Sequence, residues 1–266
     1  MGIRRRASGS SASGSTPSRA FALADRVAPP LVTAGVALVA WWAVARTAAV
    51  PAVILPSPVD VGVALADRWP ALLGAAAVTG VTAGAGTLVG AAAGAVLAAS
   101  MAASETARAA VRPYVVGLRV VPVIAVAPLL FQWFGDGVPA RALLAAALAV
   151  FPVTIATYEG LRATPREFVD LARSVGTSRT AEFRRVRLPA AAPEAFAGLK
   201  IAAAASVAGA VVAEFLTLDA GIGYRVFRAS TRLQTARMLA ALAVLAALGV
   251  AFYLVPALVE RRIRWE

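Results

Sequence analysis

The chain has 266 residues, of which 60% are hydrophobic, with a mean hydropathy of +0.76 and a formal net charge of +12. Soluble domains are about 45–50% apolar. The apolar residues here form long runs, so we predict an all-α integral membrane protein with one transmembrane domain over residues 26–266. The sequence has no Cys and no His, which excludes disulfides, Cys/His metal sites and Ser-His-Asp triads.

The sequence also lacks the lysine of a nucleotide-binding loop. A Walker A loop needs Gly-Lys-Ser/Thr, whereas Lys200, the only lysine, follows Leu199. We therefore expect no catalytic residue, cofactor or metal in this chain, and any ATP that its work needs is hydrolysed by another subunit. In a membrane protein a basic surplus reports topology and contact with anionic lipid. No aromatic residues alternate with the basic ones, so we predict no nucleic-acid partner.

The predicted elements begin with a tail. Residues 1–25 are rich in Ser, Gly, Ala and Arg, a composition that cannot bury a core, and they are predicted to be a disordered basic tail. The apolar run that follows is long enough to span, so we interpret it as an uncleaved transmembrane helix and not as a signal peptide. A span needs about 20 mostly apolar residues. Six segments qualify, at about residues 30–47, 72–99, 113–134, 140–158, 195–216 and 238–259.

The second predicted span carries glycines four residues apart, which on a helix allow another backbone to approach closely. We expect this packing to lie within one subunit, with a seam between two copies as the alternative. The pairs are Gly80/Gly84, Gly86/Gly90 and Gly90/Gly94.

The third predicted span contains Pro122 and Pro128, with Arg119 just before them. Proline removes a backbone hydrogen bond and kinks a helix, and a kinked span with a charge near its inner end is a candidate translocation element. Alternatively, Arg119 reaches the inner headgroups. For Glu214, near the end of the fifth span, a path residue and a carboxylate at the outer interface remain equally open.

An Arg-rich polar loop, about residues 160–194, joins the fourth and fifth predicted spans. Thr164, followed by Pro165 and Glu167, is the pattern of a capping box with proline at the first helical position. It predicts a helix that ends near Val175.

This helix is amphipathic, with Phe168, Leu171 and Val175 at i, i+3 and i+7 on one apolar stripe. Gly176 suits a left-handed turn at its end. Such a stripe needs a groove in a partner protein or the bilayer surface, and composition alone leaves both open.

A second short helix is predicted over residues 178–187. Pro189 is expected to end this helix, and Pro193 to begin the fifth span. The loop is thus expected to be two short amphipathic helices joined by a glycine elbow.

Arginines set the predicted topology, because cytoplasmic connections carry an excess of Lys and Arg. The tail, the second-to-third connection, this loop and the C-terminus all carry arginines and fall on one side of a six-helix path, which places both termini in the cytoplasm. Four further arginines fall on the other side and conflict with the rule, and a re-entrant segment near residues 221–230 would account for them. These are Arg225, Arg228, Arg232 and Arg237.

The loop resembles the cytoplasmic EAA loop of ABC-importer permeases, whose pattern is E-A-A, three residues, Gly, nine residues and I-x-L-P. Ala172, Gly176, Leu188 and Pro189 match this pattern at the expected spacing. Asp170 replaces the Glu, Leu171 the first Ala and Val186 the Ile. Residues 118–135, 151–162 and 213–224 are, in order, similar to permeases for nitrate, sulfonate and taurine, so the resemblance covers roughly residues 30–260.

The resemblance implies a type I ABC importer-like fold of about six transmembrane helices with a cytoplasmic two-helix coupling loop. It implies a homodimer of permeases, two ATP-binding subunits that carry ATP and Mg, and an external binding protein at a bacterial-type plasma membrane. The docking residues that it implies for the ATPase are Phe168, Asp170, Leu171, Ala172, Arg173, Val175, Gly176, Leu188 and Pro189. Weaker candidates for the translocation path are Arg119, Gln132, Trp133 and Glu214.

The implied cargo is a small solute of the sulfonate, nitrate, taurine or vitamin-precursor class, selected mostly by the binding protein. The alternative is a secondary transporter or channel with an interfacial amphipathic loop. That class needs ionisable residues within its spans to couple ions. The spans here are nearly free of such residues, which favours the permease.

Overall fold

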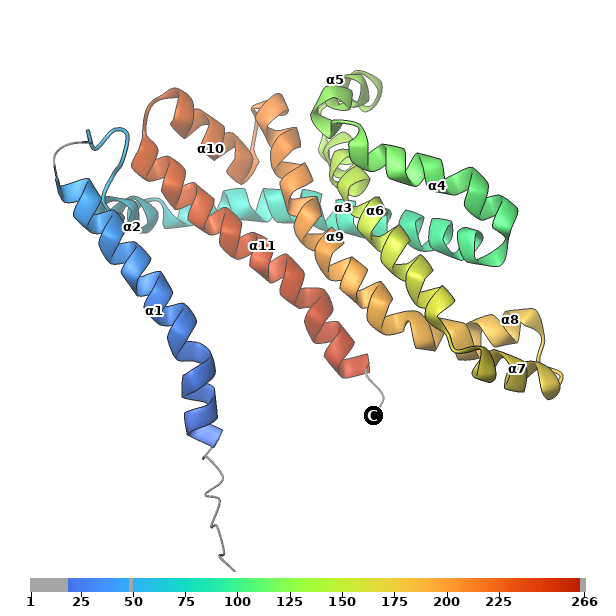
Figure 1. The fold of residues 1–266 in the computed structure, drawn as a ribbon. Helices are drawn as coiled ribbons and strands as arrows, with labels where there is room; N and C mark the ends of the chain where they lie inside the picture. Colours follow the sequence, from blue (N-terminus) through green and yellow to red (C-terminus); the bar gives the residue numbers. More distant parts are fainter. Residues whose placement is uncertain (1–18, 48–49, 264–266) are drawn as a thin grey trace, which may run out of the picture.

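The computed structural model describes residues 19–47 and 50–263, and all regular elements in these residues are helices (Figure 1). One short segment, η1, is a π-helix. The elements are α1 (Arg19–Arg46), α2 (Pro58–Asp67), α3 (Trp69–Ala103), α4 (Glu105–Val120), α5 (Val123–Phe134), α6 (Val138–Ala163), α7 (Arg166–Ser174), α8 (Arg179–Glu182), η1 (Phe183–Arg187), α9 (Leu188–Thr217), α10 (Gly221–Thr231) and α11 (Thr235–Ile263).

The first helix starts earlier than the sequence predicted. Residues 19–25, assigned to the disordered tail, form the first turns of α1, because Ala and Leu in this stretch favour a helix. Residues 1–18 of the predicted tail lie outside the described residues. The apolar part of α1, Ala28–Arg46, buries none of its residues. A helix that is apolar on all sides belongs in a membrane or against another chain.

Five segments are long and apolar enough to cross a membrane: Ala28–Arg46, α3, α6, the joined α8–η1–α9 and α11. The predicted third span, residues 113–134, is wrong as a single helix, because α4 and α5 meet there at a bend of 100°. Val121 and Pro122 are both extended at this break. The residue before a proline is forced out of the helical region, so the proline breaks the segment where the sequence predicted only a kink.

Helices α3, α6 and α9 pack against one another at the centre of the molecule. Gly86, Gly90 and Gly94 of α3 face α6 so closely that a Cβ on Gly90 would come within 2.5 Å of the Ala149 Cβ. The prediction that these glycines pack within one subunit is confirmed. Gly84 has open space around it, because its side of α3 faces away from α6.

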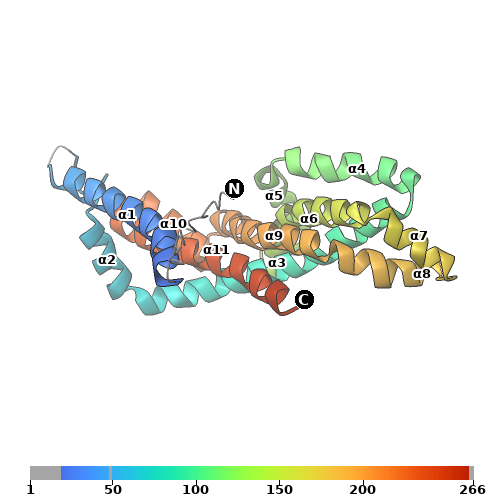
Figure 2. The same cartoon turned by 60° about the horizontal axis from the view of Figure 1, so that its bottom comes forward.

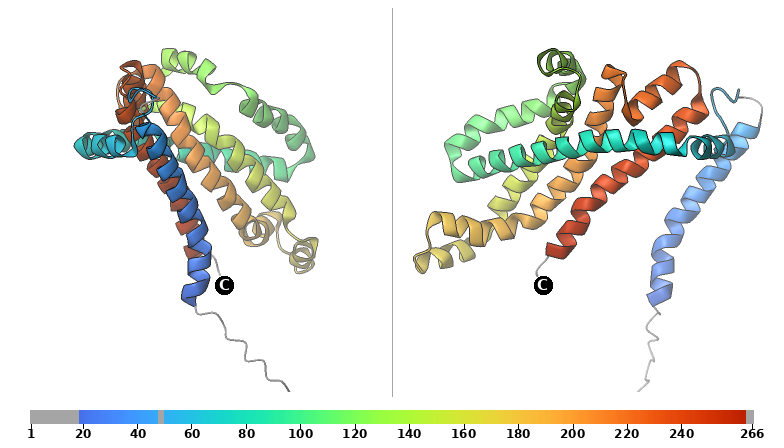
Figure 3. Two further views of the ribbon diagram at one scale, coloured as in Figure 1. Left: turned by 60° about the vertical axis from the view of Figure 1, so that its left-hand side comes forward. Right: turned by 180° about the vertical axis from the view of Figure 1, so that it is seen from behind.

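Helix α6 also meets α9 through closely packed small residues. A Cβ on Gly209 would lie 2.7 Å from the Ala145 Cα, and one on Gly198 would lie 2.7 Å from the Pro152 carbonyl oxygen. Small residues thus bring three backbones together, and α3 crosses both of its partners (Figure 3).

The helix ends lie at two opposite levels of the molecule. The start of α1, the end of α11 and the α7–α8 loop lie low in Figure 1, whereas α5 and α10 lie high. Figure 2 shows α1, α2 and α10 at one end of an elongated molecule and α4, α7 and α8 at the other. Helix α10 has 11 residues, too few to cross a bilayer. It occupies the predicted re-entrant segment and links the end of α9 to the start of α11.

Candidate coupling loop

The loop opens one residue later than the capping pattern predicted. Helix α7 begins at Arg166, with Pro165 at the N-cap and no side-chain cap. Thr164 is extended, because it precedes a proline, and its Oγ1 donates to the Leu161 carbonyl oxygen at 3.3 Å. The predicted capping box is therefore wrong, and the Thr164 hydroxyl belongs to the end of α6.

The predicted elbow is confirmed at Gly176, whose φ is +75°. The Thr177 N–H donates to the Ala172 carbonyl oxygen at 3.1 Å, and the Gly176 N–H donates to that of Arg173 at 3.0 Å. These two bonds form a Schellman motif, which closes a helix through one left-handed residue. The motif fixes the direction in which the chain leaves α7.

Helix α7 has one face against the protein and one face open. Val169 is buried, whereas Phe168, Leu171 and Val175 are 58%, 63% and 73% exposed. They line a groove of about 600 Å³ together with half-buried Ala172, and its far wall comes from η1 and the start of α9. Three large apolar side chains are thus exposed to solvent and line an open groove.

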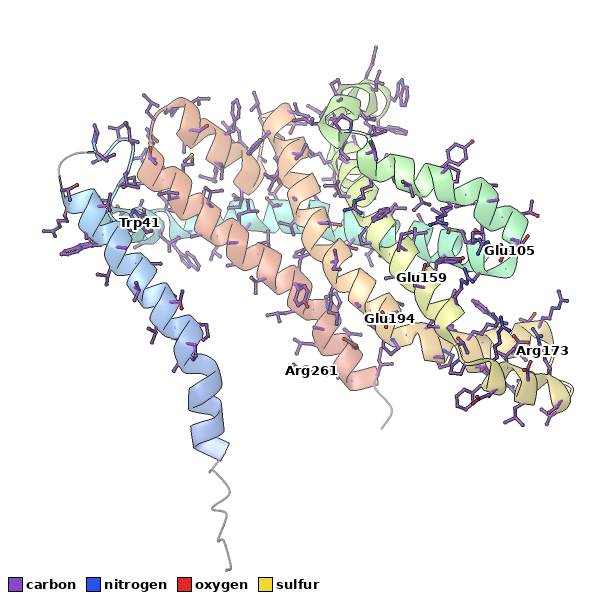
Figure 4. The ribbon with its side chains drawn as sticks, viewed as in Figure 1. Trp41, Glu105, Glu159, Arg173, Glu194 and Arg261 are labelled. Atoms are coloured by element: carbon purple, nitrogen blue, oxygen red, sulfur yellow. The ribbon has the colours of Figure 1, made fainter. Side chains whose placement is uncertain are left out.

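A buried carboxylate ties the loop together. Glu182 is 4% exposed, and its two oxygens accept from Arg173 Nε at 2.9 Å and from Arg187 Nε at 2.8 Å. Arg173 thus lies between the two short helices (Figure 4). The hydrogen bond to Glu182 and the charge of that carboxylate raise the pKa of Arg173. Sequence reasoning missed Glu182, although an acid among four nearby arginines was a usable signal.

The predicted second helix does not end at Pro189. Ser178 caps α8 by accepting from the Ala181 N–H at 3.3 Å, and the helix then continues through η1 into α9. The Leu188 N–H donates to the Phe183 carbonyl oxygen five residues back, a wide π-type turn. Pro189 follows in the first turn of α9. A proline is tolerated after such an irregular turn, because the regular bond that it would lack is already displaced.

A second buried carboxylate lies near the other end of α9. Glu214 is fully buried, and it accepts from Thr79 Oγ1 at 2.8 Å and from the Gly223 N–H at 2.7 Å. Thr79 Oγ1 in turn accepts from the Ile222 N–H at 2.9 Å. The two side chains satisfy N–H groups in the first turn of α10, which a helix leaves without partners.

Comparison with known proteins identifies the family of the chain that contains this loop. Residues 86–265 match the family model described as binding-protein-dependent transport system inner membrane component. The chain belongs to this permease family.

The permease has relatives that match over most of their length. It is 35% identical over 228 residues to a probable ABC transporter permease protein of Haemophilus influenzae, covering 86% of this chain and 93% of that protein. It is 30% identical over 255 residues to the taurine transport system permease protein of Escherichia coli, covering 91% and 90%. It is 29% identical over 239 residues to a putative aliphatic sulfonates transport permease protein of Bacillus subtilis, covering 89% and 87%.

A solved structure shares the permease's fold. The crystal structure described as an amino acid ABC transporter with histidines matches with a TM-score of 0.59 at 18% sequence identity, over 76% of this chain and 98% of that chain. The chain is thus the multi-pass permease component of an ABC importer, with a type I importer-like helical fold.

The four weaker path residues do not share one environment in the permease. Arg119 is exposed at the end of α4, and its guanidinium stacks over the Phe151 ring with 5.0 Å to the centroid. Gln132 and Trp133 are exposed on α5, and Trp133 has 67% of its surface free. Glu214 is enclosed by protein, and its carboxylate caps the start of α10.

Proposed function

We propose that this permease works as a homodimer with two ATP-binding subunits, which carry the ATP and Mg, and with an external binding protein. The α7–α8 loop and both termini face the cytoplasm of a bacterial-type cell, and the helices span its plasma membrane. The low position shared by the loop, the start of α1 and the end of α11 supports this orientation (Figure 1). So does the positive-inside rule, because the loop carries seven arginines between residues 162 and 187.

The apolar stripe of α7 supports the loop as the ATPase docking site. Phe168, Leu171 and Val175 are exposed beside a groove, and a helix presented in this way buries its apolar residues in a complementary partner. The Glu182 ion pairs and the Gly176 elbow hold the helix in one orientation. An element that is already ordered loses less conformational entropy when it binds a partner.

The cargo is a small solute of the sulfonate, nitrate, taurine or vitamin-precursor class. The names of the relatives support this range, since they include permeases for taurine, aliphatic sulfonates, nitrate, riboflavin and formylaminopyrimidine. Arg119, Gln132 and Trp133 remain the candidates for the translocation path.

Leu171→Asp tests the docking proposal. A carboxylate on the stripe would be buried against the ATPase, at a cost of at least about 3 kcal/mol or roughly a hundredfold in affinity. We expect the tagged variant, extracted from native membranes in mild detergent, to insert normally and to lose the ATP-binding subunit.

Leu233→Asp is the matched control, because Leu233 is a 71% exposed leucine in the turn between α10 and α11. This variant should retain the ATP-binding subunit. Equal retention by the Leu171→Asp variant would refute docking through α7, and a wild-type chain that copurifies with no ATPase would refute the assembly.

A further inference from the structure

The four arginines that conflict with the positive-inside rule converge on one pocket. A hollow of about 230 Å³ lies among α2, α3, α10 and α11, and five of its twelve lining residues are arginines. Arg68, at the junction of α2 and α3, joins the four that stood out in the sequence. The five arginines are Arg68, Arg225, Arg228, Arg232 and Arg237.

Three of these arginines lie on or at the end of α10. Arg225 and Arg228 on α10 and Arg232 at its C-cap follow at i, i+3 and i+7 and lie on one side of the helix. Val226 and Ala229 of the same helix are buried. The Glu214 and Thr79 hydrogen bonds hold the start of α10 in place, so the arginine face is aimed by a fixed helix.

The positive charge of the pocket has no counter-charge in its wall. No Asp or Glu lines it, and none of its five arginines forms a salt bridge within the described residues. Arg228 donates to the Tyr224 hydroxyl at 3.3 Å, and Arg237 donates to Gln234 Oε1 at 2.7 Å. An adjoining hollow contains Asp60 and Asp67, and the Asp60 carboxylate accepts from Ser57.

The floor of the pocket differs from its rim. Leu72, Ala229, Ala240 and Ala241 line it and are buried, whereas Arg68, Arg228, Arg232 and Arg237 are exposed. Like charges around a small hollow repel one another, and an anion between them removes that cost. Guanidinium groups bind planar and tetrahedral oxyanions through paired N–H donors.

We propose that this pocket binds the oxyanion group of a ligand, that is a sulfonate, carboxylate or phosphate. The apolar part of the ligand rests on the floor formed by Leu72, Ala229, Ala240 and Ala241. This proposal rests on the proposed orientation, in which the pocket faces away from the cytoplasm. The positive-inside rule does not explain an excess of arginine on that side of the membrane. The group belongs either to a free solute that approaches the permease or to an anionic lipid, since both present the same chemistry.

The test uses trifluoromethanesulfonate as the probe and the full-length chain in nanodiscs of zwitterionic phosphatidylcholine. Fluorine NMR follows the broadening of the probe signal during a titration at constant salt. We expect saturable binding to the wild type, and binding weakened by roughly tenfold or more in Arg228→Gln/Arg232→Gln, because charge-assisted hydrogen bonds are lost.

Arg261→Gln/Arg262→Gln is the control, since it removes the same charge from exposed positions at the end of α11. We expect its binding to equal that of the wild type. Equal losses in both double variants would mean that net charge alone attracts the probe, and the absence of saturable binding to the wild type would equally overturn the site. Size-exclusion elution and helical circular dichroism of the variants report whether they fold.

Nanodiscs that also contain anionic phosphatidylglycerol separate the two sources. Binding that persists there identifies a free solute as the ligand, and binding that occurs only in zwitterionic discs identifies the lipid phosphate. No ATPase takes part in this measurement, so it can fail while the Leu171→Asp experiment succeeds, and the reverse.

Discussion

A single carboxylate decides how the chain turns between its last two long helices. Glu214 accepts from Thr79 and from the Gly223 N–H inside the protein. Gly221 precedes this contact with a φ of +96°, and any side chain there would overlap the Glu214 carboxyl group. The start of α10 therefore depends on an acid, a hydroxyl and a glycine from three elements.

Replacing Glu214 tests this role. We expect Glu214→Ala to lower stability by about 1–3 kcal/mol, because the buried Gly223 N–H loses its acceptor. Glu214→Gln should retain most of the stability, since its amide oxygen can still accept. Tryptophan fluorescence during heating in detergent measures the unfolding midpoint. A Gln variant as unstable as the Ala variant would argue that the charge of Glu214, and not its capping, is what matters.

At the scale of elements, the elbow after α7 joins two stiff pieces. Its hydrogen bonds need Gly176 in the left-handed region, which β-branched residues adopt only at a cost of at least about 1–2 kcal/mol. The helix before the elbow bears the exposed stripe, and the helix after it continues into the membrane domain. A change at the elbow therefore alters the angle between docking and transport elements while leaving both intact.

We expect Gly176→Val to insert and assemble but to uncouple ATP hydrolysis from transport. The measurement is substrate-stimulated ATPase activity, together with solute uptake, in proteoliposomes of the whole complex. Gly176→Asn is the control, because Asn tolerates the left-handed conformation, and it should keep most of the coupling. Normal stimulation in the Val variant would rule out the elbow as a coupling element.

Much of this arrangement could be read from the sequence, because hydropathy, glycine spacing and the loop pattern are local properties of the chain. The glycine stripe of α3, the elbow and the exposed stripe were predicted by residue. Three of the failures lie at prolines: Pro122 broke a predicted span, Pro165 shifted a cap and Pro189 did not stop a helix. Each outcome depends on the backbone of neighbouring turns, which a residue type does not specify.

Two features of the site could not be predicted, because they join distant segments. Buried Glu182 is paired with two arginines that come from different elements. The arginine pocket needs Arg68 beside Arg237, and residues so far apart in sequence meet only once α2 and α11 have packed.

At the scale of the whole molecule, the proposed topology places the docking loop and the arginine pocket on opposite sides of the bilayer. The chain contains no cysteine, so a single introduced thiol reports its own location. Leu233, near the pocket end, and Val175, on the loop, are 71% and 73% exposed and offer matched positions.

We expect Leu233→Cys to react with a membrane-impermeant maleimide added to intact cells, because its turn faces outward. Val175→Cys should react only in inside-out vesicles from cells that lack the ATPase. Mass shift on a denaturing gel measures the labelling. The opposite pattern would invert the topology, and labelling of both positions from one side would rule out a bilayer between them.

The unbroken path from α8 through η1 into α9 has a mechanical consequence. The segment Arg179–Thr217 has 39 residues, about 58 Å at 1.5 Å per residue. One end of this segment carries the groove wall of the loop, and its other end carries the acid that fixes α10. Because no loop interrupts this helical path, we expect a displacement imposed at the docking loop to pass along α9 and to shift the arginine face at the far end.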